Sequence, residues 1–263
     1  MKALICYYSG SGNTLLAARY VAKNVRNVEI DMFDIVRDGA PDLDSYGMVG
    51  FAAFADFWAP SDLILDFIDR LPSQADKPAF VFNTFGMVSG KTLKVLADRA
   101  TAGGFRVVAG HSLHTPENYP PMMAKGLGNI NAPSAKELGK LSDFVADLDR
   151  LALRLSRGEA VPAAAMKVGL ISTIMPGYPR DKSKRVMGDK YVDETLCTEC
   201  GICAAVCPNG AIELDPKPLF DMEKCSGCWA CYNHCPTKAV YTRKLRGVHH
   251  YPKPNNQLRE KLS

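Results

Sequence analysis

The feature that most constrains this chain of 263 residues is a cysteine spacing that occurs twice. Eight of the nine cysteines follow the order Cys-x2-Cys-x2-Cys-x3-Cys-Pro, and the second copy begins 28 residues after the first. The two runs are Cys197, Cys200, Cys203, Cys207 and Cys225, Cys228, Cys231, Cys235. A segment of about 50 residues buries too little apolar surface to fold without a metal or a covalent staple. The segment therefore needs bound metal or cross-links as its core.

The spacing favours iron–sulfur chemistry. Three thiolates two residues apart can each reach a different iron of one cluster, while the fourth, before the proline, ligates the other cluster of the pair. We therefore expect one [4Fe–4S] cluster on Cys197, Cys200, Cys203 and Cys235, and a second on Cys225, Cys228, Cys231 and Cys207. The alternatives are structural zinc, which uses paired Cys-x2-Cys hooks on a long loop, and disulfides, which need an oxidising compartment. Cys6 is expected to be a small core hydrophobe.

Residues 190–243 resemble bacterial-type ferredoxins with two [4Fe–4S] clusters, through both cysteine runs and the prolines that follow them. The resemblance implies a small α+β domain. One position departs from the internal repeat, because Trp229 stands where the first copy has Gly201. The indole is open to three interpretations: it shields the second cluster, forms part of a docking face, or fills space.

The first 157 residues alternate between short apolar segments and helical patterns, which predicts an α/β fold with a doubly wound, parallel, five-stranded sheet. The expected strands are residues 2–7, 28–33, 47–54, 79–85 and 105–109. The expected helices are residues 13–26, 61–71, 90–102 and 134–157. Near-continuous apolar strands are typical of a sheet with helices on both faces.

A loop rich in glycine and serine joins the first expected strand to the first expected helix. At such a turn, backbone N–H groups converge and the helix dipole adds positive potential, so the loop is suited to a phosphate group. Hydroxyls of Ser9, Ser11 and Thr14 add further donors. No Lys follows the loop, so it is not a Walker-type nucleotide loop, and it lacks the G-x-G-x-x-G pattern of dinucleotide sites.

The S-x-S-G-N-T pattern after the first strand resembles the phosphate loop of flavodoxins, and the five-strand alternation matches. The resemblance implies FMN, with its phosphate at Ser9, Ser11, Gly12, Asn13 and Thr14. It also implies that the loops after the third and fourth strands flank the isoalloxazine ring, together with a later loop. The residues expected there are Phe54, Phe57, Trp58, Asn83, Thr84, Phe85, Gly86, Asn118 and Tyr119. We expect Trp58, ahead of Phe57, to stack on the ring; the alternative is that these aromatics fill the core.

The layout as a whole resembles the flavodoxin–ferredoxin fusion family of anaerobes. We expect a flavodoxin-like FMN-binding domain at 1–157, a linker at 158–189, a ferredoxin domain at 190–243 and a basic tail at 244–263. The linker holds an apolar stretch, 168–175, expected to pack internally. The net charge of +4 gathers in the linker and tail rather than on a folded face, which argues against nucleic-acid binding. A tail of this sign is typical of a solvated end.

These parts predict an electron-transfer protein that passes low-potential electrons between redox partner proteins through FMN and two [4Fe–4S] clusters. One alternative is an FMN-dependent reductase of a small substrate, fed by the clusters, with Tyr119 or Glu117 as proton donor. Another is a redox sensor in which cluster state controls partner binding. The sequence shows no export signal and no run of the ~18 apolar residues that a membrane span needs. We therefore expect a cytoplasmic protein without a membrane span.

Overall fold

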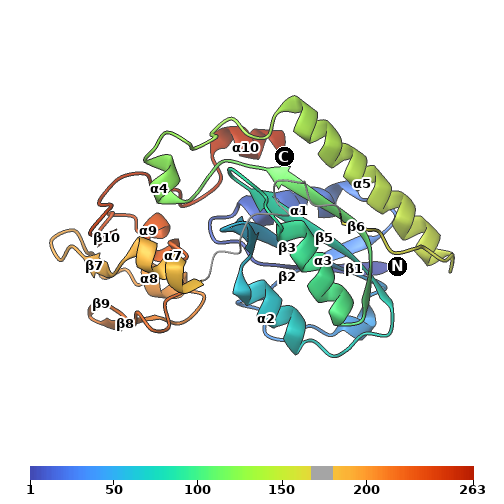
Figure 1. Ribbon diagram of the computed structural model, residues 1–263, viewed down its shortest axis with the longest axis horizontal. Coiled ribbons are helices and arrows are strands. Elements are labelled where there is room, and N and C mark those ends of the chain that lie inside the picture. The colour runs from blue at the N-terminus through green and yellow to red at the C-terminus, as the bar shows by residue number, and fades with distance from the viewer. Residues whose placement is uncertain (167–179) are drawn as a thin grey trace.

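A parallel sheet forms the centre of the first domain in the computed structural model, which describes residues 1–166 and 180–263 (Figure 1). The sheet runs in the order β2-β1-β3-β5-β6. Its strands are β1 (Lys2–Tyr7), β2 (Glu29–Asp34), β3 (Met48–Asp56), β5 (Lys77–Phe85) and β6 (Phe105–His114), with the short β4 (Ala59–Pro60) paired antiparallel to β3. This is the flavodoxin-like order of doubly wound sheets. The predicted fold class is confirmed.

Helices cover both faces of the sheet, which explains why its strands are apolar throughout. One face packs against α1 (Asn13–Asn24) and α5 (Ala135–Ser156), and the other against α2 (Asp62–Arg70) and α3 (Thr92–Ala102). The 3-10 turn η1 (Leu43–Ser45) and helix α4 (Pro120–Met123) lie in connections. Cys6 is fully buried in the α2–α3 face, as expected for a core hydrophobe.

The second domain is built from two small antiparallel pairs and two short helices. Strand β7 (Lys190–Val192) pairs with β10 (Val240–Thr242), and β8 (Ile212–Asp215) pairs with β9 (Lys217–Phe220). Helices α8 (Ile202–Ala205) and α9 (Ala230–His234) each contain the third cysteine of a run, and α7 (Arg180–Met187) precedes the domain. The apolar stretch at 168–175 lies outside the described residues.

The basic tail is not a solvated end, which corrects the expectation from its charge. After the second domain the chain returns to the first, where α10 (Asn256–Lys261) lies near α1 and α5 (Figure 1). Leu258 and Leu262 are 0% and 3% exposed and belong to the apolar cluster of the first domain. The tail is basic on its outer side, but its apolar positions complete a core.

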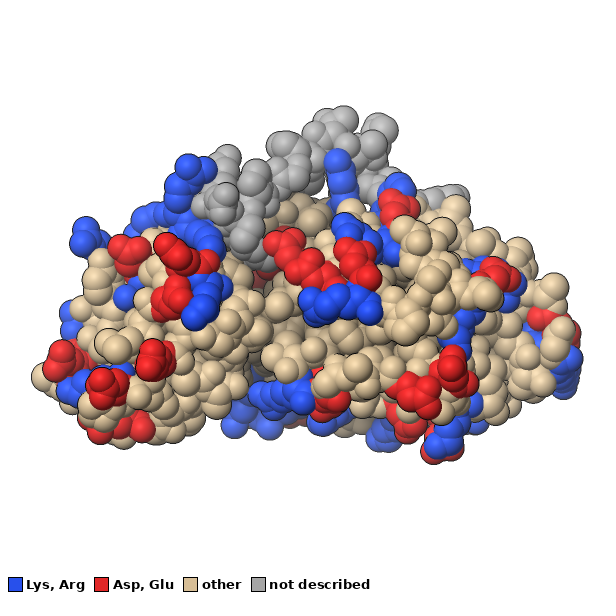
Figure 2. Space-filling model, turned by 90° about the horizontal axis from the view of Figure 1, so that it is seen from below, with Lys and Arg blue, Asp and Glu red and all other residues tan. Residues whose placement is uncertain are grey.

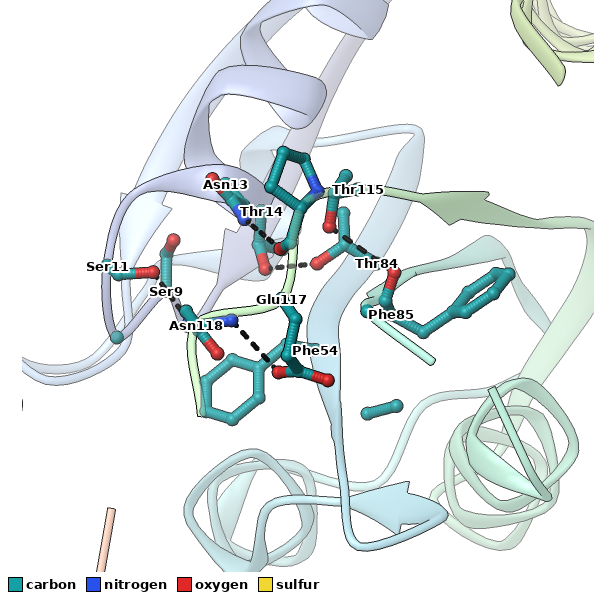
Figure 3. A pocket seen from close by; sticks show the side chains of 14 residues that line it. Ser9, Ser11, Asn13, Thr14, Phe54, Thr84, Phe85, Thr115, Glu117 and Asn118 are labelled. Carbon is teal, nitrogen blue, oxygen red and sulfur yellow. Dashed lines mark hydrogen bonds between the residues drawn. The ribbon is translucent and has the colours of Figure 1, made fainter. Parts of the chain in front are cut away.

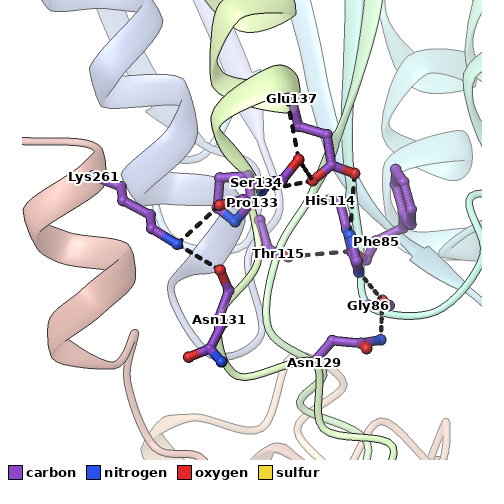
Figure 4. A network of polar contacts seen from close by, with 10 residues as sticks. All are labelled: Phe85, Gly86, His114, Thr115, Asn129, Asn131, Pro133, Ser134, Glu137 and Lys261. Atoms are coloured by element: carbon purple, nitrogen blue, oxygen red, sulfur yellow. Dashed lines mark hydrogen bonds and ion pairs between the residues drawn. The ribbon is translucent and has the colours of Figure 1, made fainter.

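Polar contacts fix this returning segment to the loops at the carboxyl edge of the sheet (Figure 4). The Lys261 ammonium donates to the carbonyl oxygens of Pro133 and Asn131, which stand just before α5. Ser134 and Glu137 form a reciprocal capping box at the start of that helix. None of the described helices is both long and apolar enough to cross a membrane.

Candidate cofactor sites

The phosphate-type loop lies between β1 and α1 at the carboxyl edge of the sheet, where ligands of doubly wound folds bind. Gly12 caps α1 with a φ of 92°, a left-handed conformation that glycine adopts without strain. The Thr14 and Thr84 hydroxyls are 2.8 Å apart, and the Asn118 side-chain amide donates to the Ser11 hydroxyl at 2.6 Å. These contacts bring the ends of β1, β5 and β6 around one small cavity (Figure 3).

That cavity, of about 300 Å³, gathers four of the five residues expected at the phosphate, all but Gly12, together with five that were expected near the ring. The expected residues that line it are Ser9, Ser11, Asn13, Thr14, Phe54, Thr84, Phe85, Gly86 and Asn118. Asn83 lies apart, because successive side chains of a strand point to opposite faces; its side chain binds Ser89 and Ser112. Thr115 and Pro116 also line the cavity and were not expected from the sequence.

A larger cavity, of about 1030 Å³ and partly open to solvent, adjoins the first. Phe57, Trp58 and Tyr119 line it, with Met87, Val88 and Met122. The backbone at Phe57 and Trp58 is left-handed, with φ of 51° and 72°, because these two residues form the tight turn between β3 and β4. A planar apolar ligand group fits such a wall, so Trp58 and Phe57 both stay candidates for the stacking residue.

Residues of the second domain complete the wall of this larger cavity. Gly227, Cys228 and Trp229 face the residues of the first domain there. Trp229 is 3% exposed, has a φ of 62°, and meets the Tyr119 ring edge-on at 6.0 Å between centroids. Three interpretations of the indole were open from the sequence. These contacts support the one in which it fills space, here between the two domains.

A buried carboxyl lies between the two cavities, since Glu117 lines both. Its Oε1 accepts hydrogen bonds from the backbone N–H groups of Asn118 and Tyr119, at 2.9 and 3.0 Å. Burial raises the pKa of Glu117, although the same N–H groups lower it in part. From the sequence, Glu117 was considered only as a proton donor in the alternative function, a reductase. The structure shows that the carboxylate also holds the loop that follows β6.

A buried polar network joins the two domains next to the small cavity. Asn233, on α9, donates to the Asn118 carbonyl oxygen at 3.0 Å and accepts from the Tyr251 N–H at 3.2 Å. The Tyr251 hydroxyl donates to Oδ1 of Asn13 at 3.0 Å. The side-chain amide of Asn13 in turn donates to the Pro116 carbonyl oxygen. Sequence patterns gave no signal for this network, because its members lie up to 238 residues apart.

The eight cysteines of the second domain line two separate cavities, of about 350 and 290 Å³. The first is lined by Cys197, Cys200, Cys203 and Cys235. The second is lined by Cys207, Cys225, Cys228 and Cys231. Each set takes three cysteines from one run and the fourth from the other, which is the grouping that the spacing predicts. The ligand assignment itself stays a prediction.

Hydrogen-bond donors reach the sulfur atoms in the same way at both cavities. The N–H groups of Ala211 and Ala239 donate to Cys207 and Cys235, each at 3.2 Å. At the second cavity the Cys225 sulfur has two more donors, the Gly227 N–H at 3.4 Å and the Lys190 ammonium at 3.0 Å. Burial lowers the pKa of Lys190, but the negative charges of Cys231, Cys225 and Cys228 outweigh this and raise it overall.

These donor sets fit the cofactors that the sequence suggests. Four thiols around each cavity, with backbone N–H groups on the sulfur atoms, suit a [4Fe–4S] cluster. Hydroxyl, amide and backbone groups at a helix start suit a phosphate, and the adjoining aromatic cavity suits a planar ring. A cluster would supply one-electron transfer at its site, and a flavin would supply transfer of one or two electrons.

Comparisons with known proteins point to an iron–sulfur domain in the second part of the chain. Residues 196–239 match the family described as a 4Fe-4S dicluster domain. A ferredoxin of Pyrobaculum islandicum is 41% identical over 51 residues, covering 19% of this chain and 48% of that protein. A putative electron transport protein of Escherichia coli, YsaA, is 34% identical over 77 residues, covering 27% and 49%. The chain thus spans about half the length of these curated relatives.

Among solved structures, oxidised flavodoxin 1 from Bacillus cereus is similar to the first domain, with 21% identity and a TM-score of 0.45. The alignment covers 57% of this chain and 98% of that one. The fold assignment rests on the strand order of the sheet. The chain therefore joins a doubly wound α/β domain to a domain that matches an iron–sulfur family over residues 196–239. More particularly, it is a fusion of a flavodoxin-like domain with a ferredoxin-type 4Fe-4S dicluster domain.

Proposed function

We propose that this chain is an electron-transfer protein that holds FMN and two [4Fe–4S] clusters and connects redox partner proteins. One observation carries the proposal: Cys228 lines both the larger aromatic cavity and the second cysteine cavity. A ring in the aromatic cavity and a cluster on that cysteine would be neighbours within one polypeptide. Holding two redox groups side by side makes their exchange intramolecular and independent of protein concentration.

The residues of the first domain divide this work between two parts of the flavin. Ser9, Ser11, Asn13 and Thr14 would bind the phosphate through hydroxyl, amide and backbone donors at the start of α1. Trp58 or Phe57 would stack on the ring and exclude water from one side. We keep the division into 1–157, 158–189, 190–243 and 244–263 as the proposed domain organisation.

The outer end of the second domain is suited to a basic redox partner. Cys200 is exposed there, and so are Leu214 and Leu219, at 42% and 57%. Figure 2 shows acidic side chains spread over this end of the molecule, and residues 191–240 carry a net charge of 3 − 7 = −4. Opposite charge on a partner accelerates encounter, and apolar side chains give the contact its area. A compartment that keeps thiols reduced, such as the cytoplasm, fits the eight cysteines.

Two of the relatives, described as a ferredoxin and a putative electron transport protein, favour the carrier. A direct test is anaerobic purification with flavin, iron and sulfide quantified, followed by rapid mixing with a one-electron reductant. We expect about one FMN and about eight irons per chain. Cluster absorbance should bleach before flavin absorbance. A protein without iron and without a yellow chromophore would end the proposal, and so would flavin that stays oxidised while the clusters are reduced.

The crossed ligand sets have their own test. Cys207→Ala removes a residue of the first cysteine run, yet it should damage the second cluster more than the first. Cys6→Ala is the matched control, because Cys6 is buried in the first domain and lines neither cysteine cavity. Preferential loss of the first cluster in Cys207→Ala would show that each run ligates its own cluster.

A further inference from the structure

Lys190 is unusual among the charged residues that the structure describes. It is the only Lys, Arg, Asp or Glu among them that is less than a tenth exposed, at 7%. A lone buried ammonium is costly unless something compensates its charge. Within the described part of the chain, its ammonium donates a hydrogen bond to the Cys225 sulfur, at 3.0 Å, and no carboxylate lies within ion-pair distance. The buried ammonium therefore lies against the sulfur atoms of the second cysteine cavity.

The internal repeat supplies a built-in comparison for this lysine. A shift of 28 residues places Lys190 on Pro218, just as it places Cys197 on Cys225. Lys190 lines the second cavity and Pro218 lines the first, so the two residues occupy equivalent places. One backbone donor is shared by the two cavities, from Ala211 to Cys207 and from Ala239 to Cys235, each at 3.2 Å. The Gly227 N–H adds a contact to Cys225 at the second cavity, and the Thr237 hydroxyl adds one to Cys235 at the first. These further contacts are uncharged, so the buried positive charge of Lys190 is the difference in charge between the two sites.

We propose that Lys190 gives the second cluster, on Cys207, Cys225, Cys228 and Cys231, the higher reduction potential of the two. The inference rests on the proposed function for the presence of the clusters. One-electron reduction adds one negative charge to a cluster, and the electron comes from the external reductant. A fixed positive charge beside the sulfur atoms stabilises the reduced form, and it does so more strongly in a water-poor interior than at the surface.

This difference would set where an electron rests in the protein. The first cavity includes the exposed Cys200, on the side open to a partner. The second cavity shares Cys228 with the aromatic cavity of the first domain. An electron taken up at the exposed end would therefore move to the inner cluster, beside the flavin site. Lys190 would thus favour electron flow from the first cluster to the second.

The test is a redox titration of the full anaerobic protein, with the clusters followed by EPR and the flavin by absorbance. In Lys190→Met, the higher of the two cluster midpoints should fall and the lower should stay. We expect a tenfold weaker reduction of that cluster, which is about 59 mV for a one-electron couple. Lys224→Met is the matched control: it removes the same charge next to Cys225, but its side chain is 64% exposed and paired with Asp221. The control should change the reduction equilibrium of neither cluster by more than a factor of about two, because solvent screens the charge of Lys224.

Equal midpoints in the wild type and Lys190→Met would overturn the inference, and so would an equal shift in both variants. Iron and sulfide contents report whether the variant keeps its clusters. Should Lys190→Met lose them, Pro218→Lys decides: a charge at the equivalent place should raise the lower midpoint, and an unchanged midpoint would overturn the inference. Failure of the proposed function would look different. The flavin would then accept no electrons from the clusters, while the midpoints of both clusters could still be measured.

Discussion

The two domains of this chain are held together in different ways. The first has a sheet buried between two apolar clusters, drawn from strands and helices along its whole length. The second has one small apolar cluster, in which Cys203, Cys225 and Cys231 are themselves among the buried members. Side chains alone can stabilise the first domain, whereas the second depends on what its cysteines bind. Stability and redox function are therefore separable in one domain and inseparable in the other.

Removal of iron should give the largest contrast between the domains. With a chelator under reducing conditions, residues 190–243 should lose protection from hydrogen exchange entirely, because the clusters serve as their core. Amides of β1, β3 and β5 should keep theirs, since their core contains no metal-binding cysteine. Hydrogen exchange of the full chain by mass spectrometry measures both at once. Protection that survives in 190–243 would contradict the comparison.

Leu258→Ala tests whether the returning segment belongs to the core of the first domain. The side chain is fully buried against that domain, so its truncation should lower the free energy of unfolding by about 2–5 kcal/mol. Leu219→Ala is the matched control, since it makes the same change at a side chain that is 57% exposed. We expect the control to change the free energy by less than about 0.5 kcal/mol. Denaturant unfolding followed by circular dichroism gives both values. A loss in Leu258→Ala as small as that in Leu219→Ala would place α10 outside the core.

His111 should make the first domain sensitive to acid. Burial, with a smaller effect of Lys140, lowers the pKa of His111 from 6.5 to about 4, and its ring stacks against those of Phe82 and Phe144. Between these two pH values the unfolded chain binds a proton that the folded chain does not, so the free energy of unfolding falls as the pH falls. The full effect is about 3 kcal/mol. Denaturant unfolding at several pH values should show a weaker dependence in His111→Gln. The exposed His249→Gln should follow the wild type, and parallel curves for all three would refute the assignment.

Tyr251→Phe should give the smallest effect, at the contact between the domains. It removes one hydroxyl, which donates to Asn13 and accepts from the Asn255 N–H. Because the Asn13 oxygen is then buried without its donor, we expect a loss of about 1–3 kcal/mol in stability and weaker FMN binding. Denaturant unfolding and fluorescence titration with FMN measure the two effects. Tyr241→Phe is the control, since its hydroxyl makes no hydrogen bond within the described residues. Unchanged FMN affinity in Tyr251→Phe would separate the network from the flavin site.

The sequence was sufficient for the local features of both domains. Apolar periodicity predicted the parallel sheet and its four main helices, and Ser134 marked the start of α5 as the structure has it. These features depend on neighbours in the chain, so a short window of sequence records them. The cysteine runs predicted the crossed grouping around two cavities because the spacing within each run fixes which sulfur atoms point together.

Contacts between distant parts of the chain left no local trace in the sequence. Charge alone made the segment after residue 243 resemble a solvated end, since Leu258 and Leu262 are too few to show a periodicity. Asn233 and Tyr251 were not singled out, because an asparagine or a tyrosine becomes part of a site only through its partner. The wall that Trp229 gives to the aromatic cavity required the relative placement of the two domains, which no motif encodes.

The return of the chain to its first domain has a consequence for synthesis on the ribosome. Leu258 and Leu262 contribute to the same apolar cluster as β1 and α1, although they are translated last of these. The first domain therefore gains these contacts only after the iron–sulfur segment has left the exit tunnel. Until then, the nascent sheet lacks the burial that Leu258 and Leu262 provide.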